Sequence, residues 1–490
     1  MLFNSEKFVL FFAVVLVIAR ILPKSMRKYW NLIASYGYYM LADLPYAVLL
    51  AGITALCFLA GIWIEEGTEK QRTHRTALSV VLLTGILCFF KVWDAIRPAL
   101  TGILGEDAAR IAVPLGISYY IFTLIGYLVD VKRGTVPAER DPAAFALFVA
   151  FFPQTLAGPI ARTSLLPQYR EGPDMTYEGM IRGLRRFLLG AFRKVVLADG
   201  IAILVDGIWR DPEAAKGILL WIAVLLYAFQ LYADFCGYSD MALGCACMLG
   251  YRLDENFRFP YYSLDFAETW GRWHISLSDW LRDYVYFPLG GSRKGKWRTY
   301  LNLMLVFLVS GLWHGIGIGY LIWGALCGLG RIGVALVKDR DPGYRKQIGL
   351  RSARAWFSRT LNFLYWSFCF FFFRVDPATV RKVPSLLFAG GSLSDALKLL
   401  GTLAQNGITQ RKPYLVFFFG SLLFAALVLG RLDRIGAGLS PMHEATDTPF
   451  DVLGKRERWF LYITMGILVL LFFFLTGSGA STVSFIYAGY

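Results

Sequence analysis

Long apolar runs recur along nearly the whole chain, and this feature restricts its fold more than any other. A helix that crosses a bilayer needs ~20 mostly apolar residues, and in lipid only helices and closed barrels satisfy their backbone polar groups internally. Hydrophobic residues make up 56% of the chain and charged residues 17%, whereas about a quarter of a soluble domain is charged. The sequence therefore predicts an all-α, polytopic integral membrane protein.

The apolar runs predict about eleven to thirteen transmembrane or re-entrant helices. Several runs are shorter than a perpendicular span, and the run 143–157 is typical of re-entrant or half-helices. The candidate spans lie near residues 8–22, 30–43, 46–64, 77–92, 111–130, 143–157, 184–206, 217–234, 300–313, 317–337, 356–374, 414–430 and 457–475. Two moderately polar stretches, 375–413 and 432–456, are loops that can each hold an interfacial helix.

The net charge of +15 is concentrated in basic loops. Basic residues favour cytoplasmic loops, so we place the loops 182–194, 293–298 and 331–359 in the cytoplasm. The basic loop 23–28 follows the first span, which puts the N-terminus outside. Attraction to anionic lipid is the ordinary use of such loops, while a second use is attraction of an acidic acyl donor. No nucleic-acid-binding motif is present, so we expect no nucleic-acid partner.

Familiar metal and nucleotide motifs are missing from the sequence. The seven cysteines include no CxxC pair, so we expect no zinc site and no disulfide framework. The chain also lacks a P-loop, an HExxH helix and a GxSxG elbow. Acid–base chemistry by histidine is then the simplest enzymatic interpretation.

His314, one of four histidines, lies in a long apolar stretch interrupted by glycines. An ionisable side chain in a membrane segment is a functional-site hypothesis by default, and imidazole suits proton transfer. The alternative is a histidine that bonds a neighbouring carbonyl inside a helix bundle. Gly311, Gly315 and Gly319 recur every four residues, and Gly324 and Gly328 repeat the spacing, which favours close helix packing.

The segment 251–298 alternates aromatic rings with charged side chains, as interfacial or re-entrant segments do. If residues 270–284 formed one helix, one stripe would hold Trp270, Trp273, His274, Leu277, Leu281 and Tyr284. A second stripe would hold Arg272, Ser276, Asp279 and Asp283. On this expectation His274 orients a substrate or a second ionisable group, or else has only a packing role.

Two carboxylates, Asp234 and Asp240, end an apolar run that also holds Ser239. They either line a polar cavity, orient a histidine, or cap the end of a helix. Paired carboxylates alone leave these alternatives open.

Several motifs in a fixed order resemble the membrane-bound O-acyltransferase (MBOAT) family. They are Phe151–Ile160, Tyr232–Met241, Glu255–Tyr261, Arg272–Tyr284, Pro288–Gly291 and Gly311–Gly315. Within the family, the chain resembles most the bacterial alginate O-acetyltransferase branch. The resemblance implies one membrane domain over 1–490, with N-terminal helices over 1–140, a catalytic core over 141–330 and C-terminal helices over 331–490. It further implies a ring of helices around a thinned core with a through-passage, in a bacterial inner membrane.

The resemblance implies that His314 and His274 are catalytic. Other residues of the motifs are then candidates for the substrate passage or the oxyanion site, namely Trp313, Arg272, Trp273, Ser276, Asp234, Ser239, Asp240 and Gln154. No bound cofactor or metal is expected. Acetyl-CoA or an acyl-carrier thioester is the expected co-substrate, with membrane lipid, a periplasmic partner protein or a polysaccharide as partners.

The expected reaction transfers an acetyl group from a cytoplasmic thioester to an extracytoplasmic hydroxyl group, with His314 as general base. His274, Arg272 and Ser276 are the alternatives for the oxyanion donor. Two other functions stay open at this point. One is transfer of D-alanyl or another acyl group from a carrier protein, and the other is transport with His314 as a proton relay.

Overall fold

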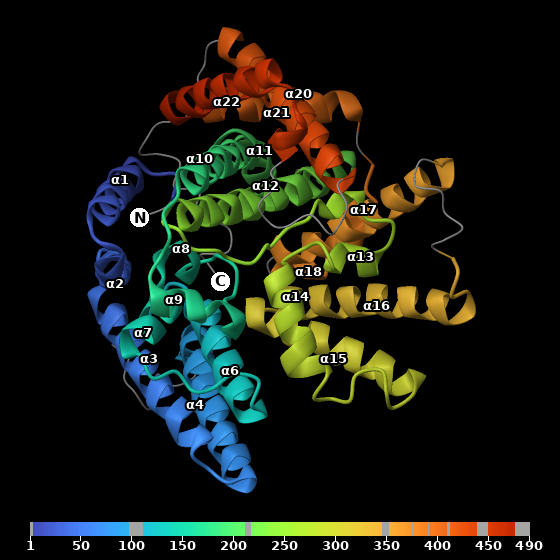
Figure 1. The fold of residues 1–490 in the computed structure, drawn as a ribbon. Coiled ribbons are helices and arrows are strands. Elements are labelled where there is room, and N and C mark those ends of the chain that lie inside the picture. Colours follow the sequence, from blue (N-terminus) through green and yellow to red (C-terminus); the bar gives the residue numbers. More distant parts are fainter. Residues whose placement is uncertain are drawn as a thin grey trace. The chain divides into compact units, whose positions relative to one another are not determined.

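The computed structural model describes residues 3–97, 111–210, 217–344, 352–374, 377–390, 392–408, 412–438 and 449–475. In these ranges the chain is helical, and its only extended pairing is the isolated bridge between Phe257 and Trp273. The helices form two compact units (Figure 1). The first unit comprises Met1–Leu184 with Ala242–Asp254, and the second comprises Arg185–Met241 with Glu255–Tyr490.

The first unit contains four long N-terminal helices and a group of shorter ones. Its elements are α1 (Glu6–Ile21), α2 (Lys24–Met40), α3 (Leu44–Glu65), α4 (Glu69–Ile96), α6 (Ile117–Arg133), α7 (Pro142–Ala150), α8 (Phe152–Thr155), η2 (Thr163–Leu165) and α9 (Pro167–Glu171). Several of these helices begin at a residue whose side chain caps the helix. The Ser5 side chain accepts a hydrogen bond from the Phe8 amide at the start of α1, and the Asp43 side chain accepts one from the Tyr46 amide at the start of α3. Such caps satisfy amide groups that have no partner within the helix.

The second unit holds the remaining elements, and two helices, α10 (Tyr177–Ala191) and α12 (Ile218–Met248), run from one unit into the other. The rest are η3 (Phe192–Ala198), α11 (Asp199–Trp209), η4 (Pro260–Tyr262), α13 (Phe266–Trp270), α14 (Ile275–Leu281), η5 (Arg282–Tyr286), α15 (Lys296–His314), α16 (Ile318–Arg340), α17 (Ala353–Arg374), α18 (Pro377–Val380), α19 (Val383–Leu387), α20 (Leu393–Ile408), α21 (Lys412–Gly438), η6 (Pro449–Val452) and α22 (Lys455–Leu475). The elements η3 and η5 are π-helical.

Five helices among the described residues are long and apolar enough to cross a membrane. They are Leu44–Glu65, Glu69–Trp93, Ile218–Met248, Ile318–Arg340 and Leu415–Gly436. The all-α membrane fold is thus confirmed. Helices also occupy the other predicted spans, and some of them are short; α1, for example, has 16 residues.

The run 143–157 forms two short helices rather than one span. The chain breaks at Phe151, between α7 and α8, where φ and ψ are −53° and 108°. Both halves are buried, and Phe152 of α8 lies against Phe8, Phe11 and Tyr38 of α1 and α2. A broken helix of this kind is tolerated where protein covers the freed backbone.

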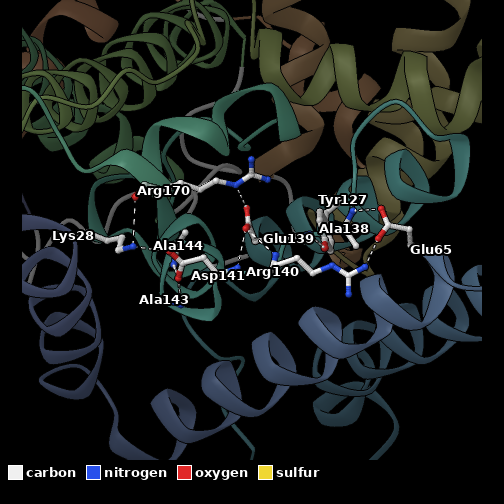
Figure 2. A network of polar contacts seen from close by, with 10 residues as sticks. All are labelled: Lys28, Glu65, Tyr127, Ala138, Glu139, Arg140, Asp141, Ala143, Ala144 and Arg170. Carbon is white, nitrogen blue, oxygen red and sulfur yellow. Dashed lines mark hydrogen bonds and ion pairs between the residues drawn. The ribbon is translucent and has the colours of Figure 1, made fainter. Parts of the chain in front are cut away.

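A network of polar contacts in the first unit secures the loop between α6 and α7 (Figure 2). Its centre is the buried carboxylate of Glu139, whose Oε1 accepts hydrogen bonds from the amides of Arg140 and Asp141, both at 2.9 Å. Its Oε2 accepts from Arg170 Nε at 2.6 Å. The amide of Glu139 in turn donates to the Tyr127 hydroxyl at 3.0 Å. The Glu139 carboxylate thereby joins the loop to α9, and the Glu139 amide joins the loop to α6 through Tyr127.

The network continues to α2, α3 and α7. Lys28 Nζ lies 2.6 Å from Asp141 Oδ2, while Asp141 Oδ1 caps the first amides of α7. Glu65, at the end of α3, accepts from the amide of Ala138 at 2.8 Å and from Arg140 at 2.5 Å. These charge-assisted contacts hold three helix ends and one loop in a fixed arrangement.

We predict that Glu139→Gln lowers the apparent melting temperature of the detergent-purified protein. Glutamine keeps an acceptor for the loop amides but loses the charge-assisted bond to Arg170, so the expected loss is about 1–3 kcal/mol. A thermal unfolding scan at fixed detergent measures the effect. Glu171→Gln, at an exposed neighbouring position, is the control, and equal melting temperatures for the two variants would contradict the role given to Glu139.

Candidate active site

His314 is the last residue of α15, immediately before the turn that leads into α16. The glycines around it let the two helices approach closely. A side chain at Gly311 would meet the carbonyl oxygen of Tyr320, and a Cβ at Gly324 would lie 2.5 Å from the carbonyl oxygen of Phe307. The close packing that the glycine spacing predicted is confirmed for this pair of helices. Helix α15 ends at His314, so Gly315 lies in the turn.

Three aromatic rings enclose the imidazole of His314, which is 3% exposed. Their ring centroids lie 4.7 Å (Trp313), 5.1 Å (Trp323) and 4.9 Å (Phe373) from that of His314, all edge to face. We call Trp313, Trp323 and Phe373 the aromatic shell. Such surroundings penalise the charged form of an imidazole, so the shell favours a neutral ring.

A wall of further tryptophans continues from the aromatic shell. Trp270 lies 5.9 Å from Trp323 and 5.3 Å from Trp366, and Trp366 lies 5.3 Å from Trp273. All four indoles are at most 6% exposed. Trp270 and Trp273 thus belong to the core of the second unit, and the interfacial or re-entrant place expected for this segment stays a prediction.

His274 lies between two helices rather than within one. Helix α13 ends at Trp270 and α14 begins at Ile275, while His274 has a left-handed backbone with φ of 42°. The prediction of one continuous helix over 270–284 is therefore wrong. The two stripes of side chains that such a helix would carry do not form. The cause is a pairing with a distant segment, in which Phe257 bridges Trp273 and the Ile275 amide donates to the Asn256 carbonyl.

The structure connects the two histidines through Trp313. The ring of His274 lies 6.1 Å from Trp313 and 4.7 Å from Phe235, and its Nδ1 is 3.3 Å from Asn256 Oδ1. His274 is 1% exposed, and this burial lowers its pKa to about 3. The protonated form is disfavoured, so His274 is neutral at physiological pH.

Asp234 and Asp240 do not end a helix, because α12 continues to Met248. Both carboxylates are buried in ion pairs. Lys194 Nζ lies 2.6 Å from Asp234 and 2.7 Å from Asp199, whereas Asp240 pairs with Arg186 at 3.0 Å and with Arg193. The helix-end interpretation is wrong, and the partners of the two carboxylates are cations rather than a histidine.

These ion pairs join distant parts of the second unit. Arg193 also contacts Asp433 of α21 at 2.7 Å, and Arg186 contacts Glu255 at 2.5 Å. The π-helical η3 carries Arg193 and Lys194 in succession, both buried. Removing one partner of a buried pair typically costs 3–5 kcal/mol, so these charges hold η3, α12 and α21 together beside the histidines.

The remaining predicted site residues have varied surroundings. Ser276 and Ser239 both bond the side chain of Asn256, at 2.7 Å and 3.3 Å. Arg272 is paired with Glu268 at 2.8 Å. Gln154 belongs to the first unit, where its Nε2 donates to the Phe148 carbonyl at 2.6 Å. The structure thus gathers Ser239, Ser276, Trp273 and Trp313 around His274, while Arg272 bonds elsewhere.

A half-open pocket of about 550 Å³ lies at the basic end of α15 and α16. Its walls are largely apolar, and Arg331 and Lys338 of α16 line it together with Val334 and Ala335. Trp270 and Phe307 line it as well, and Trp270 contacts Trp323 of the aromatic shell. The remaining lining residues are Asp265, Ala267, Gly271, Ile275, Ser278, Asp279, Leu281, Arg282, Tyr286, Phe287, Thr299, Leu303, Val306, Pro342 and Tyr344.

Sequence reasoning missed this pocket, as well as Asn256, Trp323 and Phe373. The residues 331, 334, 335 and 338 do share one face at helical spacing, but a basic loop gave the simpler interpretation. Within the described ranges, no group of three or more His, Cys, Asp and Glu side chains has a metal-binding arrangement.

Comparisons with known proteins agree in pointing to acyl transfer. A sequence model of MBOAT, the membrane-bound O-acyltransferase family, matches residues 59–332. The protein named "Probable alginate O-acetylase AlgI" of Pseudomonas putida is 33% identical over 490 residues, covering 96% of each chain. A "Peptidoglycan O-acetyltransferase" of Helicobacter pylori is 32% identical over 415 residues, 78% of this chain and 75% of that protein. A "Teichoic acid D-alanyltransferase" of Bacillus subtilis is 29% identical over 226 residues, 43% and 56% respectively.

We predict that Gly324→Ala lowers both thermal stability and activity. Its Cβ would lie 2.5 Å from a backbone oxygen of α15, so the helices must separate, at a cost of about 1–3 kcal/mol. Gly333→Ala, on the same helix with open space around it, is the matched control and should keep or raise the melting temperature. Unfolding scans and acyl-transfer rates of both variants measure this, and equal behaviour would refute close packing at Gly324.

Proposed function

Because the chain belongs to the membrane-bound O-acyltransferase family, we propose that it moves an acetyl group from a cytoplasmic thioester to a hydroxyl group outside the membrane. The family and its O-acetylase relatives make the chain an O-acyltransferase and a multi-pass bacterial membrane protein. The observation that carries the proposal is the neutral-favouring aromatic shell around His314. An alginate-type exopolysaccharide is the first acceptor to test, since the relative that covers most of the chain is named for alginate.

In the proposed reaction, His314 is the general base. The acceptor hydroxyl attacks the thioester carbonyl while the imidazole of His314 takes its proton. The tetrahedral intermediate then collapses, the carbon–sulfur bond breaks, and the thiolate recovers the proton from His314. Positioned proton transfer typically contributes ~10²–10⁴-fold to a rate. Burial supports this role because a neutral imidazole can accept a proton, and because exclusion of water limits thioester hydrolysis.

The pocket at the basic end of α15 and α16 supports an entry site for the donor. Arg331 and Lys338 suit phosphate groups of coenzyme A or of a carrier's phosphopantetheine, and the apolar walls suit an extended thioester arm. Phe307 lines the pocket and precedes His314 by seven residues, about 10 Å along the helix. Trp270 lines the pocket and lies 5.9 Å from Trp323, whose ring lies 5.1 Å from that of His314.

D-alanyl transfer from a carrier protein is the second candidate, favoured by the similarity to a teichoic acid D-alanyltransferase. Radiolabelled acetyl-CoA and a D-alanyl-loaded carrier, offered separately to the purified protein, distinguish the two donors. The transporter alternative is set aside, since the family match and the named relatives are acyltransferases.

The remaining parts of the proposal concern place and partners. We place the protein in the bacterial inner membrane with its N-terminus outside, on the basis of the basic residues of the segment 23–28 at the start of α2. The acceptor is either the polysaccharide itself or an extracytoplasmic partner protein that passes the acetyl group on. No resident cofactor is required, because the thioester supplies the activated acyl group.

We predict that His314→Gln lowers acetyl transfer by about 10²–10⁴-fold and leaves the melting temperature close to that of the wild type. Glutamine fills similar space within the aromatic shell but cannot take up a proton. The assay follows radiolabelled acetyl groups from acetyl-CoA into the acceptor in reconstituted membranes. His74→Gln, at an exposed position of α4 in the first unit, is the control, and a normal rate for His314→Gln would show that His314 is not the base.

We predict that Val334→Trp raises the KM for the thioester donor about 10-fold or more while kcat changes little. The indole fills a pocket that the donor would occupy. A 10-fold rise in KM corresponds to a loss of ~1.4 kcal/mol in the binding free energy of the donor. Val337→Trp is the matched control, because Val337 lies on the same helix, is 48% exposed and is outside the pocket. If both variants had the wild-type KM, the donor would not use this pocket.

A further inference from the structure

Asn256 is fully buried at the point where two distant segments meet. The backbone on either side of it pairs with the segment around His274. The Ile275 amide donates to the Asn256 carbonyl at 3.0 Å, and the Arg258 amide donates to the Arg272 carbonyl at 2.9 Å. This short pairing forces His274 into its left-handed conformation and sets its ring against the side chain of Asn256.

The side-chain amide of Asn256 joins three elements. Its Oδ1 accepts a hydrogen bond from Ser276 Oγ at 2.7 Å and lies 3.3 Å from His274 Nδ1. Its Nδ2 donates to Ser239 Oγ on α12 at 3.3 Å. A carbonyl oxygen can only accept, so a hydrogen bond at this contact requires the proton on Nδ1 of the ring. With a proton on Nδ1, a neutral imidazole has its lone pair on Nε2.

We propose that Asn256 is a positioning residue that holds His274 as the Nδ1–H tautomer and makes its Nε2 a hydrogen-bond acceptor. The inference rests on the proposed acyl transfer and deepens it, because it changes the role of His274. A neutral His274 with this tautomer has no Nε2 proton to give to an oxyanion. It accepts a hydrogen bond from the attacking hydroxyl instead, while His314 takes the proton, so His274 gains and loses no proton in the reaction.

The shared contact with Trp313 supports a joint role for the two rings. Trp313 lies 6.1 Å from His274 and 4.7 Å from His314, so one indole sets the spacing between them. A hydroxyl group that enters beside Trp313 would meet two neutral imidazoles, one orienting it and one deprotonating it. Orientation of this kind raises the rate because the lone pair of the hydroxyl oxygen points at the thioester carbonyl before the reaction begins.

The charges on the elements around His274 do not favour its protonated form. They are Asp234 and Asp240 on α12, Glu255 and Arg258 beside Asn256, Asp265, Glu268 and Arg272 at α13, and Asp279, Arg282 and Asp283 at α14 and η5. The buried carboxylates of α12 pair with Lys194, Arg186 and Arg193, and Glu255 pairs with Arg186. Asn256 Oδ1 lies 3.3 Å from Nδ1 of His274 and is thus a polar group in direct contact with the ring.

Solid-state ¹⁵N NMR of histidine-labelled protein in bilayers tests the tautomer directly, because the chain has only four histidines and His274→Gln identifies the relevant signal. The expected wild-type spectrum has a protonated Nδ1 and an unprotonated Nε2 for His274. In Asn256→Ala this preference should be lost, and kcat should fall about 10²-fold with little change in KM, as is typical when an orienting partner is removed. A wild-type spectrum with the proton on Nε2 would overturn the proposal.

Asn256→Asp separates positioning from packing. A carboxylate also accepts from Nδ1–H, so the tautomer should be kept, but its charge stabilises the imidazolium and raises the pKa of His274. As the pH falls through that raised pKa, the neutral ring is lost, so the acidic limb of the kcat profile should move to higher pH than in the wild type. An unmoved profile together with normal kcat in both Asn256 variants would refute the role.

Asn362→Ala is the matched control for folding. Asn362 is a half-buried asparagine of the second unit, and its Nδ2 donates to the Thr269 hydroxyl at 2.8 Å and to the Ser263 carbonyl at 3.3 Å. Its variant should lose stability but keep the wild-type pH profile and the His274 tautomer, and an equal kcat loss in both alanine variants would refute a specific role for Asn256. The general-base proposal is tested separately. A normal rate in His314→Gln would contradict it and would not change the tautomer measured for His274.

Discussion

The close approach of α15 and α16 is the contact on which the histidine site depends. At Gly311 and Gly324 each helix lies against the backbone of the other, with no room for a side chain on either glycine. The close approach of the two helices brings Trp323 of α16 against the ring of His314 at the end of α15. In a bilayer, where apolar side chains gain little by leaving lipid, backbone contact through glycine is an effective way to fix two helices. A small shift here would open the aromatic shell and admit water to the imidazole.

Buried charge supplies the second constraint, because a charge in an apolar interior must be paired. Arg193 illustrates this, since it contacts Asp240 on α12 and Asp433 on α21 at once. Each pair costs desolvation, so its value lies less in net stability than in the registry it imposes. Ser239, one residue before Asp240, then receives the amide of Asn256. The ion pairs therefore fix the face of α12 on which the hydrogen bonds to Asn256 and His274 are built.

Local patterns predicted the helices, the membrane class and the glycine packing, because each depends on residues close in sequence. Two interpretations failed where distant residues decide the outcome. His274 was assigned to a continuous helix, but pairing of Phe257 with Trp273 breaks that helix. Asp234 and Asp240 were compatible with a helix end because their partners, Lys194, Arg186 and Arg193, lie some forty or more residues earlier in the chain. Hydropathy also gave no sign that Trp270 and Trp273 are packed inside the protein, because their partners Trp323 and Trp366 lie far away in the sequence.

The two histidines share an indole neighbour but have different polar surroundings, and the difference suits different tasks. His314 has the rings of Trp313, Trp323 and Phe373 edge to face around its imidazole. His274 has an amide partner that selects one nitrogen before any substrate arrives. A base that must take and return a proton benefits from an environment that binds neither form strongly, whereas a group that only aims a hydroxyl benefits from being fixed in advance. In the proposed reaction, the contact with Asn256 therefore suits His274 to direct the attack, and the aromatic shell suits His314 to take and return the proton.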